Sequence, residues 1–196
     1  MPPYTLVSVP KKSVNQGRPT PKKKYVMIFD WDDVATYARD EKNVRVTDLT
    51  FKEGKNPIGV FATSRTINPY SESSGESSQA GFLQHVDFEH PGTDLEFDEF
   101  IENNINRELG AIVIPCDGVD ARIAGTPCIP LVMTVAGQDN NEAAKHTVQL
   151  VSEMIGSVLG HISKELIPVT DNEDINTALG LPYVPPAGDG EGEGGV

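Results

Sequence analysis

The stretch VMIFDWDD, residues 26–33, joins four apolar residues to three carboxylates around a tryptophan. Preceded by Tyr25, the run is rich in β-branched and aromatic side chains, which predicts a strand. Its acids have two interpretations. Asp30 and Asp32 match the Asp-x-Asp arrangement of magnesium-dependent aspartate-nucleophile phosphatases, in which one carboxylate is the nucleophile and the other a general acid. Alternatively, they end a strand and are solvated or contact another subunit.

The surrounding segments decide between these interpretations, because the phosphatase arrangement needs a parallel sheet with crossover helices. Between residues 34 and 92 no segment predicts an amphipathic helix. Alternating or β-branched runs there predict strands instead: NVRVTDLTF (43–51), IGVFATSRTI (58–67) and GFLQHVDFEH (81–90). The Ser-rich segment 68–82 predicts a long surface loop. The strand-end interpretation of the acids is therefore favoured.

The second half of the chain predicts one helix and further strands. In TDLEFDEFIENNINREL (93–109), Thr93 and Glu96 fit a capping box and the apolar residues recur on one face, which indicates a helix packed on a sheet. Segments 111–116 and 121–135 predict a hairpin. Segment 145–163 can be drawn as one helix, but its β-branched residues, with Gly156 and Gly160, favour two strands joined by a turn.

Together these elements predict a mainly β (α+β) fold, an antiparallel β-sandwich or barrel with one flanking helix. A chain of 196 residues is long enough to bury one ordinary hydrophobic core, so we expect a single domain. We expect an extended basic arm over 1–24, a single β-rich domain over 25–168, and a C-terminal segment over 169–196 that ends in a disordered Gly- and acid-rich tail.

The charge is unevenly distributed along the chain. The net charge is −13, yet residues 1–24 contain six lysines and arginines and no acid. Such an arm can bind nucleic acid or lie on the acidic body of a neighbouring copy. We favour the second, because the arm has few aromatics and carries apolar residues suited to strand addition. No segment is long and apolar enough to span a membrane.

Other catalytic and metal-binding patterns are weak. A strand would place His85, Asp87 and Glu89 on one face, within reach of a metal, but no further ligand is evident and a solvated face is the simpler interpretation. Cys116 and Cys128 lack zinc-site spacing, and the chain has no Gly-x-Ser-x-Gly motif or phosphate-binding glycine loop. We therefore expect no enzymatic activity and no cofactor.

Several stretches, in order, resemble a family of phage virion proteins related to tail-tube and tail-ring subunits, especially those of phages of gut Bacteroidota. They are IFDWDDV, RDEKNVRV, FKEGKNPIGVFATS, the Ser/Gly/Glu loop, FLQHVDFEHPG, IVIPCDG and GTPCIPLVMTV, within residues 24–165. The resemblance implies a β-sandwich or barrel flanked by a helix. It also implies a homo-oligomeric ring in the virion, assembled in the host cytoplasm, that lines or supports a channel for DNA.

On that basis we expect contacts with neighbouring tail or connector proteins and transient, non-specific contact with phage DNA. The expected subunit-interface residues comprise the basic arm, the acids of the opening stretch and the loop at 69–80. They are Lys11, Lys12, Lys22, Lys23, Lys24, Asp30, Asp32, Asp33, Tyr70, Ser71, Glu72 and Glu76.

Overall fold

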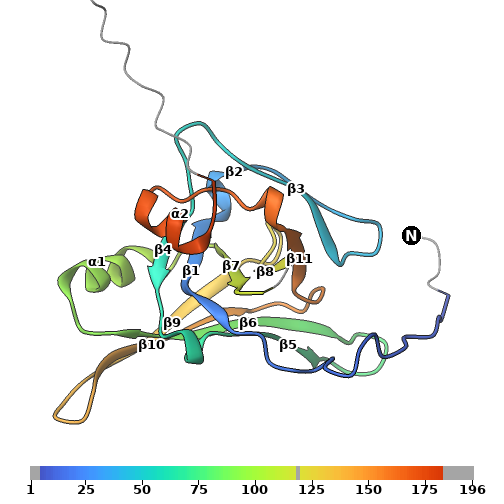
Figure 1. Ribbon diagram of the computed structural model, residues 1–196, viewed down its shortest axis with the longest axis horizontal. Coiled ribbons are helices and arrows are strands. Elements are labelled where there is room, and N and C mark those ends of the chain that lie inside the picture. Colours follow the sequence, from blue (N-terminus) through green and yellow to red (C-terminus); the bar gives the residue numbers. More distant parts are fainter. Residues whose placement is uncertain (1–4, 118–119, 183–196) are drawn as a thin grey trace, which may run out of the picture.

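The computed structural model describes residues 5–117 and 120–182, so the predicted disordered Gly- and acid-rich tail lies outside the described residues. The described part is mainly β, as predicted, and contains two α-helices (Figure 1). The strands are β1 (Lys22–Asp30), β2 (Val34–Arg39), β3 (Arg45–Phe51), β4 (Ile58–Phe61), β5 (Asn68–Ser74), β6 (Gly81–Pro91), β7 (Leu109–Pro115), β8 (Asp120–Ala124), β9 (Leu131–Asp139), β10 (Ala144–Ser152) and β11 (Gly160–Ser163).

The helices are α1 (Leu95–Asn104) and α2 (Glu173–Leu179), with short 3-10 turns η1 (Trp31–Asp33), η2 (Ser64–Thr66) and η3 (Lys164–Leu166). The strands form one connected sheet in the order β2-β3-β11-β8-β7-β9-β10-β6-β5, and β1 pairs with both β4 and β7. Among the described strands, β3 and β11 run parallel, and the remaining pairs are antiparallel. The prediction of a mostly antiparallel sandwich-like fold is confirmed.

Strand β1 lies between two hydrophobic clusters, which explains its uninterrupted apolar run. Val26 and Ile28 face the cluster that β6, β9 and β10 close from one side. Met27 and Phe29 face the opposite way, onto the cluster that includes residues of β3, β8, β11 and α2. Because successive side chains of a strand alternate between faces, residues 26–29 bury both faces of β1 in the centre of the molecule.

The buried amide of Gln84 on β6 joins separate parts of the chain. The Gly125 backbone N–H donates to Gln84 Oε1 at 2.8 Å, and Gln84 Nε2 donates to the Ser157 carbonyl at 2.8 Å. Both halves of the amide are thereby satisfied, so a polar residue in the predicted inward phase of β6 stabilises the core.

The structure corrects the extent of the predicted helix and adds a second one. Helix α1 ends at Asn104, because Leu109 is buried at the start of β7 rather than on a helix. Its N-cap is Asp94, whose side chain accepts from the Phe97 N–H, so the predicted capping role of Thr93 is wrong. Helix α2 was not predicted. It is short, and its signals are local: Asn172 caps its start and Gly180, at φ 68°, ends it.

The prediction of a long loop over 68–82 is wrong, because residues 68–74 form β5 along β6. Segment 145–163 does form two strands, β10 and β11, but they are not neighbours: β10 pairs with β6 and β9, and β11 with β3 and β8. The arm also ends earlier than predicted, since residues 22–24 belong to β1.

Candidate assembly interface

The carboxylates that end β1 are held by partners within the same chain. Asp30 Oδ1 accepts a hydrogen bond from the Asp32 N–H at 2.8 Å, and its Oδ2 lies 3.1 Å from Arg107 Nη1. Asp33 pairs with Lys55 at 3.0 Å. The cations of these pairs are about half exposed, so the pairs contribute little stability. Asp32 is exposed, and its carboxylate is the one most open to another subunit.

The surroundings of Asp30 differ from the phosphatase arrangement in two respects. Strand β1 is antiparallel to both of its neighbours, β4 and β7. Both oxygens of the proposed nucleophile are engaged, one by a backbone N–H and one by a guanidinium. In the described part of the chain, no three His, Cys, Asp or Glu side chains gather in a way that could hold a metal ion.

His85, Asp87 and Glu89 lie on one face of β6, as predicted; His85 and Asp87 share Tyr70 as a neighbour, whereas Glu89 has a different partner. The His85 ring stacks on Tyr70 with centroids 4.5 Å apart, and its Nε2 is 3.5 Å from Glu72 Oε1. Glu89 pairs with Lys145. Burial raises the pKa of the Asp87 carboxyl above its ordinary value. The three side chains therefore do not converge on a shared ligand.

The predicted residues of segment 69–80 are divided between two faces of β5. Tyr70 and Glu72 lie beside His85, on the face of β5 and β6 that points away from the core. Ser71 points the other way, and its Oγ accepts a hydrogen bond from the Leu159 N–H at 2.9 Å. Glu76 lies in the exposed turn between β5 and β6. Ser71 thus has a role within the subunit.

The basic residues near the N-terminus also fall into two groups. Lys11 and Lys12 lie on the exposed arm. Lys22, Lys23 and Lys24 belong to β1, where Lys22 Nζ donates to the Thr20 carbonyl at 2.8 Å and Lys23 Nζ to the Ala178 carbonyl at 3.4 Å. These contacts fasten the start of the strand to its own subunit.

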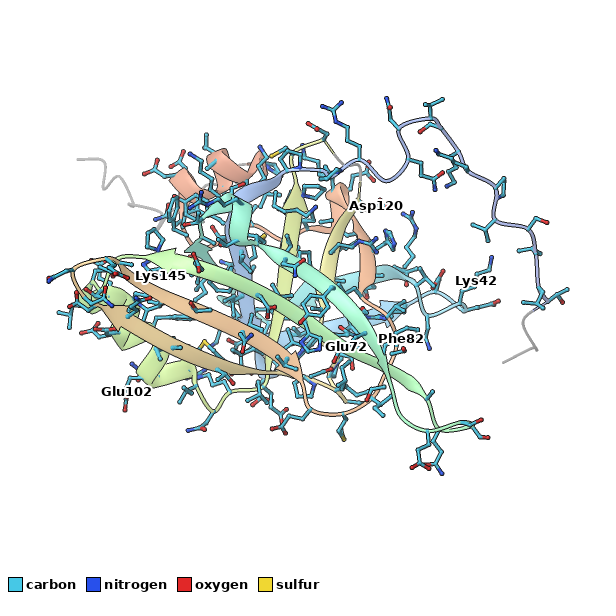
Figure 2. The ribbon with its side chains drawn as sticks, turned by 90° about the horizontal axis from the view of Figure 1, so that it is seen from below. Lys42, Glu72, Phe82, Glu102, Asp120 and Lys145 are labelled. Atoms are coloured by element: carbon cyan, nitrogen blue, oxygen red, sulfur yellow. The ribbon has the colours of Figure 1, made fainter. Side chains whose placement is uncertain are left out.

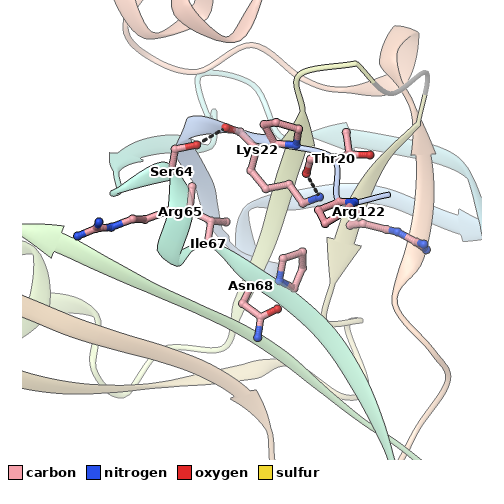
Figure 3. A pocket seen from close by; sticks show the side chains of 10 residues that line it. Thr20, Lys22, Ser64, Arg65, Ile67, Asn68 and Arg122 are labelled. Carbon is pink, nitrogen blue, oxygen red and sulfur yellow. Dashed lines mark hydrogen bonds between the residues drawn. The ribbon is translucent and has the colours of Figure 1, made fainter. Parts of the chain in front are cut away.

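A pocket lies where the arm joins the body (Figure 3). The Lys22 amine points into it, while the guanidinium groups of Arg65 and Arg122 point away from each other on its two sides. Arg122 Nη1 instead donates to His161 Nε2. The three cations therefore do not form one anion-binding cluster.

Strands β9, β10, β6 and β5 form a layer with two open edges. The sequence does not indicate this layer, because the polar residues of β5 predict a loop. Beyond β5 the described sheet has no further strand, and β9 pairs with β7 only at Leu131, leaving residues 132–139 unpaired on that side. Figure 2 views this layer from below, with Glu72 and Lys145 labelled. Neither open edge carries a lysine, but β5 contains Pro69 and Glu72, which limit pairing along part of its length. Residues 132–138 of β9 contain no charged residue and no proline.

Helix α1 is held on this layer by two histidines. His90 stacks on Phe97 with centroids 3.9 Å apart, donates through Nδ1 to the Phe61 carbonyl at 2.9 Å, and lies 3.2 Å from Asp94. His146 lies 3.2 Å from Asp98. His90 and His146, which lie far apart in the sequence, therefore both contact acids in the first turns of α1.

No protein-family model, curated protein or solved structure matches this chain. Neither helix in the described residues is long and apolar enough to cross a bilayer.

Proposed function

We propose that the chain is a virion structural protein that self-assembles into a ring or tube of a phage tail or head–tail connector, where it lines or supports the passage of DNA. The observation that carries the proposal is the pair of open edges, β5 and β9, on opposite sides of one layer. Edge strands pair readily with strands of another chain. When the two edges differ, the contact is heterologous and successive copies close into a ring or continue as a tube.

The two faces of this layer support the proposal. One face packs on the core through residues such as Val86, Phe88 and Leu150. The other face carries mainly polar side chains: Asn68, Tyr70, Glu72, His85, Asp87, Glu89, Lys145, Thr147, Gln149, Thr134 and Gln138. Acids outnumber lysine on it. A channel wall formed by this face would repel DNA and let it pass without sticking.

A charge on the β9 edge tests the proposal. Thr134 is exposed, and its backbone lies within the unpaired part of β9. We expect Thr134→Lys to prevent the formation of rings or tubes by purified protein, because a lysine on an edge strand disfavours pairing with a further strand. Thr134→Val keeps a β-branched side chain at the same position and should assemble like the wild type. Assembly of the lysine variant at wild-type concentration would contradict the proposed edge contact.

The alternative function, a magnesium-dependent phosphatase that uses Asp30 and Asp32, has a direct assay. The wild type and Asp30→Asn are compared on a broad set of phosphate esters, with and without magnesium. Our proposal predicts no magnesium-dependent turnover by either protein. Activity that Asp30→Asn abolishes would replace the structural proposal with the enzymatic one.

A further inference from the structure

The N-terminal arm carries apolar side chains that its own subunit does not cover. Leu6, Val7, Val9 and Val14 are 91%, 64%, 87% and 90% exposed. Each is too apolar to favour water. Leu6, Val7 and Val9 lie in a segment without helix or turn, Val14 begins the turn that follows, and such exposed apolar residues are typical of a peptide that binds in a groove or along a strand. The arm therefore needs a complementary surface.

A groove of matching character runs between β4 and α1. Two hollows meet there at Ile58 and Phe100, and apolar side chains of Val60 and Phe97 extend its floor. Among the described strands, β4 pairs with β1 alone, and residues of β4 line the groove on its other side. His90 binds the Phe61 carbonyl on that side, and Gly59 also lines the groove. This edge is four residues long and its Phe61 carbonyl is already bound by His90, so a bound arm would be held mainly by side-chain contacts.

The charges of the arm and the groove are complementary. Lys11 and Lys12 lie between Val9 and Val14 in the arm. Asp94 and Glu96 stand at the start of α1, at one end of the groove. At the other end Asp30 and Asp33 already pair with Arg107 and Lys55, and Arg107 also lines that hollow. Helix α1 itself carries Glu96, Asp98, Glu99 and Glu102 and no lysine or arginine. Lysines of a bound arm would therefore meet unpaired negative charge along α1 rather than at the Asp30 end of the groove.

The arm and the groove of one subunit lie at opposite ends of its long axis (Figures 1 and 2). In Figure 1 the arm extends to the side marked N, whereas α1 lies on the opposite side of the body. An arm that extends away from its own groove is placed to reach the groove of the next subunit in a head-to-tail series.

We propose that residues 5–14 of one copy bind in the groove between β4 and α1 of a neighbouring copy. The apolar residues contact Ile58 and Phe100, and Lys11 and Lys12 pair with the acids of α1. This inference rests on the proposed self-assembly and specifies its second contact. It also assigns the arm a different partner from the one expected from the sequence: helix α1 instead of Asp30, Asp32 and Asp33. Asp30 and Asp33 already pair with Arg107 and Lys55 of their own chain.

Disulfide cross-linking between copies tests the inference. The exposed cysteines Cys116 and Cys128 are first replaced by serine. One full-length variant then carries Val9→Cys and a second carries Phe100→Cys, and the two are mixed under assembly conditions, oxidised and separated on a non-reducing gel. We expect a covalent dimer that contains one copy of each. Thr47→Cys, on the exposed face of β3, replaces Phe100→Cys in the matched control and should give little dimer.

The charge contribution is measured in the same assay. Lys11→Gln with Lys12→Gln should lower the yield of cross-linked dimer roughly fivefold, as expected for the loss of two exposed ion pairs. An unchanged yield would overturn the assigned pairing with α1.

The outcomes separate this inference from the proposed function. Rings or tubes seen by electron microscopy without a Val9–Phe100 cross-link above the Thr47 control would overturn the groove and leave self-assembly standing. A link that forms only within a chain carrying both cysteines, and not between mixed chains, would overturn binding to a second copy. Absence of any particle would overturn both proposals.

Discussion

At the scale of residues, Asp30 shows how a motif depends on its surroundings. Its sequence context matches a nucleophile, but in the structure the carboxylate caps η1 and contacts Arg107. The cap is a hydrogen bond to a backbone N–H and needs only an oxygen acceptor, whereas the contact with Arg107 needs a charge. Asparagine and alanine at this position separate the two roles.

We expect Asp30→Ala to lower the free energy of unfolding by about 1 kcal/mol, because the Asp32 N–H loses its acceptor. Asp30→Asn keeps an acceptor and should cost less than about 0.5 kcal/mol, the range of an exposed ion pair. Urea denaturation of the three proteins gives both values. Equal losses for the two variants would show that the charge, and not the cap, holds this turn.

His161 provides a pH-dependent contribution to stability. Burial, followed by the charge of Arg122, lowers its pKa below the ordinary value of 6.5. Below pH 6.5 His161 is therefore protonated more readily in the unfolded chain than in the folded chain. The free energy of unfolding decreases as the pH falls through that value. His161→Gln keeps an acceptor for Arg122 but cannot titrate.

We expect the unfolding free energy of the wild type to decrease between pH 7 and pH 5.5 more than that of His161→Gln, since the variant lacks this proton-binding difference. Thermal or urea unfolding at a series of pH values measures it. Parallel pH profiles of the two proteins would exclude His161 as the group responsible.

At the scale of elements, α1 depends on its first turn. Asp94 caps the helix by accepting from the Phe97 N–H at 2.9 Å, and that bond together with His90 lowers the pKa of its carboxyl. The same residue therefore begins the helix and fixes it to β6 through His90.

We expect Asp94→Ala to destabilise the protein by about 1 kcal/mol and to increase amide hydrogen exchange over 95–104, since the helix loses its cap. Asp94→Asn retains a good cap and should protect the helix nearly as well as the wild type. If both variants exchange alike, the contact with His90 outweighs the cap.

Elements with strong periodicity were predictable from the sequence. Strand β1 and the alternation of β6 bury side chains in the pattern that their sequences show. The predicted stripe of α1 is correct only in its first part: Phe97 is buried and Phe100 and Ile101 are partly buried, whereas Ile105 is exposed. Strand β5 was missed because its residues, NPYSESS, are polar on an edge where little burial is required. Helix α2 spans only seven residues, too few for a periodic signal, although its caps at Asn172 and Gly180 are visible in retrospect.

At the scale of the whole molecule, pairing of distant strands limited the prediction. Nothing local indicates that β11 lies between β3 and β8, or that β1 separates two clusters. The position of α1 could not be predicted for the same reason. His90 and His146, which contact the helix, lie far apart in the chain and come together only when β6 pairs with β10. The open edges of the layer likewise follow from the complete strand order.

Removal of the arm tests how the subunits hold together. Deletion should stop before residue 19. Residues 19–21 line the pocket on the body, the Pro21 carbonyl accepts a hydrogen bond from the Cys116 N–H, and β1 begins at Lys22. We expect the truncated protein to fold but to assemble only at higher protein concentration, and we expect wild-type assembly to weaken at about 1 M salt, which screens exposed charges. Light scattering measures both. Assembly indifferent to the deletion and to salt would remove the arm from the interface.

We propose that copies of this chain associate head to tail into a closed ring or tube. The most direct measurement is the size and shape of particles formed by the purified full-length protein, seen by electron microscopy, together with its detection in purified virions. We predict rings or tubes with a central channel and the chain present in virions. A protein that stays monomeric at high concentration and is absent from virions would contradict the claim.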